Sequence, residues 1–573
     1  MTDPNLLAVA RGGAPADLVF ANARIVNTFT GEVEEGNVAV YGGRIAGVGD
    51  YTEGRQVVDL RGRYLSPGFI DGHVHIESSY LHADQYARAV VPHGTLGVVT
   101  DLHEVANVAG LPGLRFLRDC FKRVPLDLRI VAPPCVPATR LETAGAELGP
   151  REIARALKWQ TVIGLGEAMN FPGVINGDET MHAKLAAAGE RPKDGHAPRV
   201  RGRALNAYLC PLVGSDHETT QLEEGREKLR RGMYLMVREG STEKNLAELL
   251  PLVTDGTYHR CMLVVDDRNA KDLYHDGDVD AVVRKAVRLG MDPVRAITMA
   301  SLVPATWFRL AGLGAVAPGY WANLLVLGDL QRLAIEQAYF RGGLVAENGK
   351  ALFSARMPHN PWIRRTFDVK PFGPEDLALR WGGTGAFPVI EIVPGQIITR
   401  WVNEPPRTRD GQVVADPSRD LLKLTVVERH KATGNIGVGL VKGFGLKRGA
   451  FASSVAHDSH NIVCVGASDE DIHAVAKEIE RLNGGLAVAV DGKVLGSLGL
   501  PIAGLLSDRP LEEVATRLEE LESFTAELGC TAPSPFSILS FVALPVVPEL
   551  KLSDRGLVDV GRMRLIDLAE WGH

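Results

Sequence analysis

Residues 66–75 read SPGFIDGHVH, a short apolar run that ends in two histidines separated by one residue. On a β-strand the side chains of residues i and i+2 point to the same face, so His73 and His75 can bind one metal ion together. The pair alone is a weak signal, because most histidines at this spacing are ordinary surface or core residues. It predicts a metal site only if further ligand types follow other strands of the same sheet.

The sequence that follows this motif alternates between apolar strands and helix-length amphipathic stretches. The predicted strands include LGVVTDLH, RIVAPPC, TVIGLGEA, LNAYLCPLVGSDHE, MYLMVREGS and CMLVVDD. Alternation of this kind implies parallel strands joined by right-handed crossovers. About 240 residues of it, from 68 to 310, fit a (β/α)8 TIM barrel.

Both flanks of this region have the short runs and the Gly, Asn and Asp turns of β-structure. We expect residues 1–67 and 311–370 to form one composite β-sandwich domain, assembled from both sides of the barrel. Residues 371–573 follow a connection that bears Pro and Arg, and we expect a separate C-terminal α+β domain there. Within it, DEDIHAVAKEIERLN (469–483) predicts an amphipathic helix that begins at the N-cap Ser468. The predicted fold class is α/β.

Composition narrows the class of protein. The chain has 573 residues, 45% hydrophobic and 23% charged, a balance that argues against disorder and fibrous structure. A net charge of -7 without a long basic run argues against a nucleic-acid binder. The longest apolar stretches fall short of the ~20 residues of a membrane span, and the start of the chain lacks a signal-peptide pattern. The six cysteines form no CxxC pair, so we expect a cytoplasmic protein with free thiols.

Further metal-ligand types stand at the ends of predicted barrel strands. Because these ends converge on one face of a barrel, the side chains are expected to meet the HxH pair. They are Glu167 at the end of TVIGLGE, His196 in DGHAP, His217 in GSDHE, and the pair Asp266-Asp267 that closes CMLVVDD. Four histidines and two carboxylates suffice for two divalent ions that share a water molecule. Of the two aspartates we prefer Asp266, at the strand end, as ligand and proton acceptor.

Other catalytic patterns are absent or broken. His75-Ile76-Glu77 matches the HxE of zinc nucleoside deaminases, but PCVPA places Ala138 where the second cysteine of their PCxxC must stand. No GxGxxG leads from a strand into a helix, and neither a Walker A loop nor a GxSxG pattern is present.

The sequence resembles the amidohydrolase superfamily and, within it, the bacterial-type adenine deaminases. Coverage runs from about residue 17 nearly to the end of the chain. Many amidohydrolases share the HxH, whereas HIESS, HEVAN and HDSHN are much narrower motifs. The matching stretches are 66–95, 100–110, 164–177, 194–198, 214–218, 231–241, 266–268, 426–466 and 539–560.

The resemblance implies hydrolysis of adenine to hypoxanthine and ammonia, an activity of purine salvage. It implies two divalent metal ions, with manganese or iron(II) suggested by the family and zinc equally suited to such ligands. The implied ligands are His73 and His75 for one metal, His196 and His217 for the other, Glu167 as the bridge, and Asp266 as remaining ligand and proton shuttle. A homodimer and a small purine base as the partner are also implied.

Attack of the activated water on C6 gives a tetrahedral intermediate, and ring N1 and the departing amine then need acids close to that face. The candidate acids are Asp266, Glu239 in VREGS and His103 in DLHE. Side chains that could orient the base or brace the ligands are Glu77, Glu104, Arg238, His457, Asp458 and His460. For Arg238 and Glu239, an outward-facing ion pair on a barrel helix is an equal alternative. For HDSHN (457–461), we favour a loop folded over the barrel mouth over a polar turn satisfied by its own backbone.

Two other functions stay open. One is hydrolytic deamination of N6-methyladenine or another 6-substituted purine, which only the shape of the pocket would separate from adenine deamination. The other is a non-catalytic barrel that serves as a binding scaffold. A scaffold predicts missing ligands, and all six ligand positions are filled.

Overall fold

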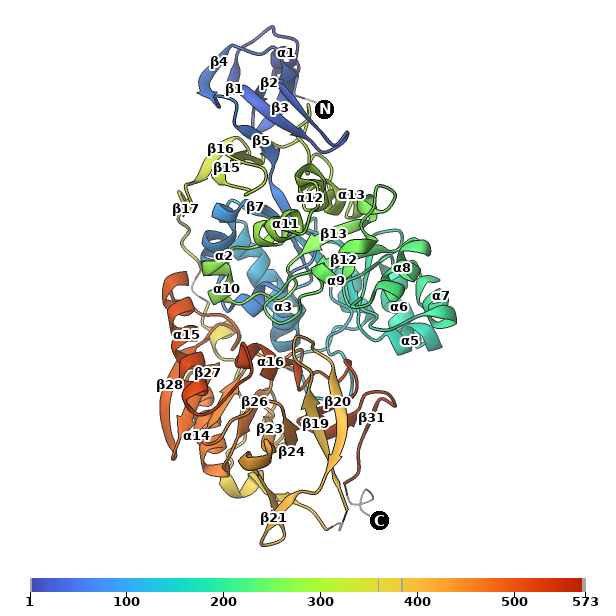
Figure 1. Cartoon of the computed structure of the whole chain (residues 1–573), viewed down its shortest axis with the longest axis vertical. Helices are drawn as coiled ribbons and strands as arrows, with labels where there is room; N and C mark the ends of the chain where they lie inside the picture. The colour runs from blue at the N-terminus through green and yellow to red at the C-terminus, as the bar shows by residue number, and fades with distance from the viewer. Residues whose placement is uncertain (1–2, 359, 383–384, 569–573) are drawn as a thin grey trace.

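The structure is a computed structural model that describes residues 3–358, 360–382 and 385–568. Figure 1 shows three parts along the long axis: a small β-rich part at one end, strands and helices of the barrel region in the middle, and a larger mixed part at the other end. Among the described residues, no helix has the length and apolar character needed to cross a membrane. All six cysteines are free thiols, as predicted, and only Cys210 is exposed.

Eight parallel strands in the described part of the chain form the middle region. Strands β6 to β10 pair in chain order, as do β11 to β13. Strand β10 lies against β11, and Val74, just after β6, forms a parallel bridge with Asp266, just after β13. This order agrees with the predicted barrel. The strands are β6 (Phe69–Asp71), β7 (Thr95–Thr100), β8 (Asp127–Ala132), β9 (Val162–Ala168), β10 (Lys193–Gly195), β11 (Ser215–Asp216), β12 (Tyr234–Arg238) and β13 (Cys261–Val264).

Helices follow the barrel strands, and local sequence signals set their ends. The Asp292 side chain accepts a hydrogen bond from the Arg295 backbone N–H at 2.9 Å, which caps α12 just before a proline at its first position. The helices are α2 (Ala83–Val90), α3 (His103–Phe121), α4 (Pro150–Ala156), α5 (Phe171–Asn176), α6 (Glu179–Ala187), α7 (Gly202–Leu209), α8 (Leu222–Arg230), α9 (Leu246–Leu249), α10 (Ala270–His275), α11 (Val279–Arg288), α12 (Pro293–Met299) and α13 (Leu302–Trp307).

The predicted strand over residues 205–218 is wrong for most of its length. Its first part lies in α7, which buries Leu205 and Tyr208. These two residues are three apart and therefore share one helix face, a spacing that an apolar run conceals. Only Ser215 and Asp216 form a strand there.

Strands from both sides of the barrel join in one sheet, which contains nine strands within the described ranges. Its order is β17-β16-β15-β14-β5-β1-β2-β3, with β4 beside β1. Strands β5 and β14 are antiparallel, and Pro67, at the start of the barrel, is opposite Leu324, just after its end. The sheet comprises β1 (Ala16–Asn27), β2 (Glu32–Tyr41), β3 (Arg44–Gly49), β4 (Gly54–Asp59), β5 (Tyr64–Pro67), β14 (Leu324–Leu327), β15 (Ile335–Phe340), β16 (Gly343–Glu347) and β17 (Lys350–Ala351), and α1 (Pro4–Ala10) packs on it.

The C-terminal part is built on a sheet with the order β20-β19-β24-β23-β26-β25-β27-β28. Helix α14 packs against β25–β28, and the Ser468 side chain caps it as predicted. Helix α15 packs against α10 of the barrel. The elements are β18 (Leu379–Arg380), β19 (Phe387–Ile392), β20 (Thr399–Glu404), β21 (Arg407–Arg409), β22 (Gln412–Val414), β23 (Leu422–Val427), β24 (Ile436–Lys442), β25 (Ala450–Ser453), β26 (Ile462–Gly466), α14 (Asp469–Arg481), β27 (Gly485–Val490), β28 (Lys493–Gly499), α15 (Leu511–Glu527), α16 (Pro535–Phe541), β29 (Leu550–Ser553), β30 (Gly556–Asp559) and β31 (Arg564–Leu565).

One buried histidine makes the stability of the barrel region depend on pH. His82 stacks on Phe116 with ring centroids 5.7 Å apart, and burial lowers its pKa to about 4. Between about pH 4 and pH 6.5, the His82 side chain is therefore protonated in the unfolded chain but neutral in the folded chain. This contribution to the free energy of unfolding is fully present above pH 6.5 and is lost as the pH falls towards 4, by up to about 3 kcal/mol.

We therefore expect His82→Gln to reduce the loss of stability between pH 7 and pH 4.5 by about 2 kcal/mol. The measurement is chemical unfolding of both proteins at the two pH values. His93→Gln is the matched control. Burial acts to lower the pKa of His93, but the interaction with Asp280 outweighs burial, so the pKa is raised. The contribution of His93 to the pH dependence of stability therefore has the opposite sign. Equal pH dependence in wild type and His82→Gln would contradict the assignment.

Candidate metal centre

The six predicted ligands meet where the barrel strands end. The HxH pair lies just beyond β6, which ends at Asp71, rather than on the strand itself. The bridge of Val74 to Asp266 keeps the backbone extended there, and the rings of His73 and His75 lie 4.9 Å apart between centroids. The other four are Glu167 within β9, His196 directly after β10, His217 directly after β11, and Asp266 two residues after β13.

Glu167 stands between the two histidine pairs. Its Oε1 lies 3.0 Å from His75 Nε2 and 3.5 Å from His73 Nε2. Its Oε2 lies 2.8 Å from His196 Nδ1 and 3.3 Å from His217 Nε2. Each carboxylate oxygen thus faces one pair, which is the arrangement of a carboxylate that bridges two ions.

Asp266 completes the side that holds the HxH pair. Its Oδ1 lies 3.3 Å from His73 Nε2 and 3.2 Å from His75 Nε2. Its Oδ2 accepts a hydrogen bond from the Arg238 guanidinium at 2.8 Å. The backbone is fixed as well, because the Asp266 N–H donates to the His73 carbonyl and the His75 N–H donates to the Asp266 carbonyl.

The donor set fits two divalent metal ions. Ligand atoms about 3 Å apart are the edges of a coordination shell with bonds of about 2.0–2.2 Å. His73 Nε2, His196 Nε2 and Glu167 Oε1 are buried and have no hydrogen-bond partner among the described residues. His73, His75 and Asp266 are one group of converging donors, and His73, Glu167 and His217 are another.

The charges of the cluster also favour cations. Burial acts to lower the pKa of His75, yet the surrounding carboxylates, Asp267 first, raise it well above its usual range. For Glu167, burial acts to raise the pKa, but the His217 charge and hydrogen bonds from histidines hold it well below the usual range. Buried carboxylates that keep their charge against desolvation need compensating positive charge, which a divalent ion supplies.

Two carboxylates beside the ligands were not singled out from the sequence. Glu218 Oε1 lies 3.5 Å from His217 Nε2, and the carboxylate binds Arg238 through two hydrogen bonds of 2.6 and 3.0 Å. Asp101, directly after β7, lies with its Oδ1 3.6 Å from His75 Nδ1. Both stand at strand ends, so the rule that selected Glu167 and Asp266 also points to them.

His103 and the HDSHN segment meet at the mouth of the barrel. Asp101 Oδ2 lies 2.8 Å from His103 Nδ1, which leaves Nε2 facing Glu104 Oε1 at 3.1 Å and Asp458 Oδ1 at 3.5 Å. Glu104 in turn contacts His457 and His460 through its two oxygens. The side chains of this segment therefore contact barrel residues at the cluster and are not satisfied within their own turn.

Two further carboxyl groups, those of Glu77 and Asp267, lie close to the residues at the mouth of the barrel. Glu77 is fully buried and accepts the Val105 backbone N–H at 3.1 Å; burial, then repulsion by Glu104, raises its pKa to about 7. Asp267 accepts a hydrogen bond from Ser78 and lies 3.6 Å from His457 Nε2. The adjacent aspartates thus have different partners, and Asp266 is the one against the HxH pair.

Glu239 is the predicted site residue that the structure does not bring to the cluster. Its carboxylate pairs with Lys285 of α11 and accepts the Leu246 backbone N–H at 2.8 Å. Arg238 is the last residue of β12 and points inwards, whereas Glu239 follows it and points outwards. The alternative of an outward-facing ion pair on a barrel helix does not hold for Arg238, which lies on a strand and inside the site. Glu239 forms an ion pair with Lys285, but it is buried and does not lie on a helix.

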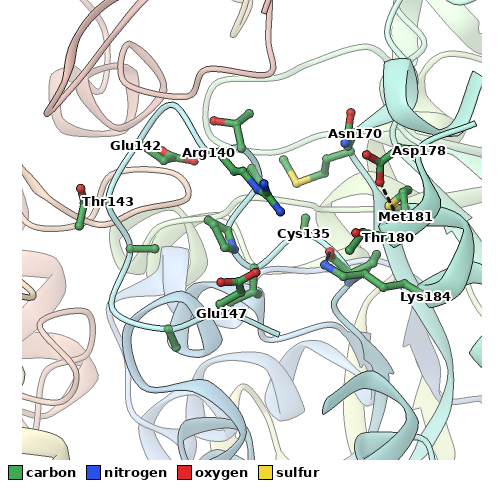
Figure 2. A pocket seen from close by; sticks show the side chains of 18 of the residues that line it. Cys135, Arg140, Glu142, Thr143, Glu147, Asn170, Asp178, Thr180, Met181 and Lys184 are labelled. Carbon is green, nitrogen blue, oxygen red and sulfur yellow. Dashed lines mark hydrogen bonds between the residues drawn. The ribbon is translucent and has the colours of Figure 1, made fainter. Parts of the chain in front are cut away.

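A cavity of about 810 Å³ opens onto the cluster and has Glu167 in its wall. Figure 2 shows Arg140, Glu142 and Thr143 on a loop at one side of it, with Asn170, Met181 and Lys184 on the other. The cavity is larger than a small base requires, and among the six predicted ligands it is Glu167 that lines it.

Comparison with known proteins gives consistent matches along the chain. Residues 64–352 match the model described as the amidohydrolase family, and residues 396–564 match the adenine deaminase C-terminal domain. An adenine deaminase of Dehalococcoides mccartyi strain 195 is 54% identical over 98% of both chains. Adenine deaminase 2 of Carboxydothermus hydrogenoformans is 48% identical over 99% of both chains. The solved L-hydantoinase of Arthrobacter aurescens covers 59% of this chain and 98% of its own at 15% identity, with a TM-score of 0.44.

Proposed function

Because the chain belongs to the adenine deaminase family of the amidohydrolases, we propose that it hydrolyses adenine to hypoxanthine and ammonia at the cluster around Glu167. The observation that carries this proposal is the position of Glu167, with one oxygen against each histidine pair. A cluster of four histidines and two carboxylates at the mouth of a barrel suits hydrolysis by water, not a binding scaffold.

Two divalent ions would be held by His73, His75 and Asp266 on one side and by His196 and His217 on the other, with Glu167 shared. When bound, such ions lower the pKa of water towards neutrality and polarise the substrate. Manganese or iron(II) is proposed from the family and zinc from the ligand types.

Asp266 is proposed as the group that takes the proton of the attacking water and delivers it to the departing amine. Its pKa is held well below the usual range, since the close contacts with His73 and His75 and the Arg238 charge outweigh burial. Arg238 fixes the carboxylate through Oδ2 and leaves Oδ1 facing the HxH side. The water's hydroxyl oxygen becomes O6 of hypoxanthine, and the amine leaves as ammonia.

His103 is the second proposed acid, positioned to protonate the ring or the amine through Nε2. Asp101 holds its other nitrogen, which fixes the orientation of the ring and keeps its pKa well above the usual range against burial. Glu104, His457 and His460 brace this face, and Asp458 lies beside it. Glu77 supports the first turn of α3 by accepting the hydrogen bond of the Val105 backbone N–H.

The three-part division, with residues 1–67 plus 311–370, 68–310 and 371–573 as units, belongs to the proposal. So do a cytoplasmic location, a homodimer and a role in purine salvage. The single sheet shared by both barrel flanks supports the first of these units. The other two units follow from the pattern of strands and helices, the location follows from the cysteine pattern, and the homodimer and salvage role follow from the family.

The test of the proposed function is ammonia release from purified protein supplied with Mn(II). We expect rapid release from adenine and at least 100-fold lower kcat/KM for guanine and cytosine, because guanine has its exocyclic amine at C2 and not at C6, and cytosine is a single ring. N6-methyladenine is assayed alongside. If N6-methyladenine turned over faster than adenine, the substrate assignment would move to 6-substituted purines, and inactivity on all of these bases would favour the scaffold.

A further inference from the structure

The loop that follows β8, residues 133–149, forms one wall of the cavity and is clamped by the C-terminal part. Asp554 accepts hydrogen bonds from the Thr143 backbone N–H at 2.8 Å and from its hydroxyl at 2.7 Å. The Asn461 side chain donates to the Thr143 carbonyl at 2.9 Å. Ser553 donates to the Leu141 carbonyl at 2.6 Å. The residue between Leu141 and Thr143 is therefore held in place from both sides.

That residue is Glu142, which Figure 2 shows on the loop beside the cavity and which lines the same cavity as Glu167. It is only 3% exposed, and neither oxygen has a hydrogen-bond partner of good geometry among the described residues. Burial, and then the charges of Asp458 and Asp554, raise the pKa of its carboxyl well above the usual range, against smaller opposite effects of Thr139 and Ser459. A buried carboxyl without partners, facing a cavity, is a group that a ligand can satisfy.

Glu142 lines the same cavity as Glu167 but is not one of the metal ligands. Ser459 lies beside it, and the adjacent Asp458 has its Oδ1 3.5 Å from His103 Nε2. His103 Nδ1 is 3.8 Å from Glu167 Oε1. A run of polar groups thus leads from Glu167 to Glu142, and both residues line one cavity.

We propose that Glu142 is the specificity residue for the free base, and that as a neutral acid it hydrogen-bonds the N3–N9 edge of adenine. This inference rests on the proposed function. A protonated carboxyl offers one donor and one acceptor side by side. N3 is an acceptor and N9–H a donor, so the two groups match through a pair of hydrogen bonds. In a nucleoside the sugar replaces the N9 proton, which removes one bond and places bulk against Glu142.

Other polar side chains of the cavity are less suited to this role. Lys184 already donates to the Pro134 carbonyl at 2.6 Å. Glu147 also lines the cavity but is exposed to solvent, where hydrogen bonds to water compete with those to a ligand. Glu147 is therefore the matched control for Glu142, with the same side chain, the same loop and no burial.

The test compares adenine, 9-methyladenine and 3-deazaadenine as substrates of wild type, Glu142→Leu, Glu142→Gln and Glu147→Gln, each loaded with Mn(II). We expect wild type to discriminate against both analogues by about 100-fold in kcat/KM, since each leaves a buried group unpaired. Glu142→Leu should lose about 100-fold on adenine, mainly through KM, with little change for the analogues. Glu142→Gln should keep discrimination, because a neutral amide also donates and accepts. Glu147→Gln should behave as wild type.

Equal use of adenine and 9-methyladenine by wild type would overturn the assignment. So would a parallel loss on all three bases in Glu142→Leu. If Glu142→Leu failed to fold, the wild-type series and Glu142→Gln would decide the matter. A wild-type protein that releases no ammonia from adenine would instead overturn the proposed function, so the two failures are distinguishable.

Discussion

Asp266→Asn is expected to lower kcat for ammonia release from adenine by roughly 10³- to 10⁴-fold. The amide can still accept a hydrogen bond from Arg238, so the fold of the site persists. It carries no negative charge towards His73 and His75, and it cannot take a proton from water. The measurement is steady-state ammonia release together with metal content, which separates loss of the proton acceptor from loss of metal.

Asp267→Asn is the matched control, one residue further along the chain. Its carboxylate contacts Ser78 and His457 and not the HxH pair, so we expect a loss of about tenfold or less, as for a group that supports others. A larger loss in Asp267→Asn than in Asp266→Asn would reverse the two roles. This comparison resolves a choice that the sequence leaves open, because two adjacent aspartates cannot be told apart by spacing.

Removal of metal is expected to abolish activity, to below about 1% of the loaded enzyme, because the proposed reaction depends on water activated at the cluster. Activity should return in proportion to added Mn(II), Fe(II) or Zn(II) and saturate at two ions per chain. Glu167→Gln should not reach full activity at two equivalents, since a neutral amide bridges two cations poorly. Titration of the chelated protein with metal, followed by ammonia release, measures both.

The control for this titration is Glu147→Gln, whose side chain lies outside the cluster and should leave the titration unchanged. Saturation of wild type at one ion per chain would show that the two halves of the cluster do not hold separate metals. Full recovery of Glu167→Gln at two equivalents would show that the bridge is dispensable.

The part of the site that follows from strand ends could be predicted from the sequence. His73, Glu167, His217 and Asp266 occupy such ends, and parallel strands in a barrel have only one face on which their carboxyl ends can meet. Glu239 stands at the same kind of position, but its side chain lies away from the cluster, because successive residues alternate in direction and a shift of one residue reverses the side chain.

The contacts made by the C-terminal part have no local signal. His460 reaches Glu104 across 356 residues, and no periodicity encodes such a pairing. His457 and Asp458 entered the prediction through the HDSHN motif of the family and not through physical reasoning. The clamp of Asp554 on Thr143 likewise depends on the packing of the finished fold. Burial of Glu142, and hence its chemistry, could not be inferred before that packing was known.

The antiparallel pairing of β5 with β14 has a consequence for synthesis of the chain on the ribosome. Residues 16–67 emerge first, but the strand that completes their sheet follows only after the whole barrel has been made. At about 5–20 residues per second, this interval lasts roughly 10–50 s. During it, β5 exposes an unpaired edge of the kind that promotes association between chains. This edge of β5 therefore stays unpaired during synthesis until residues 324–327 are available.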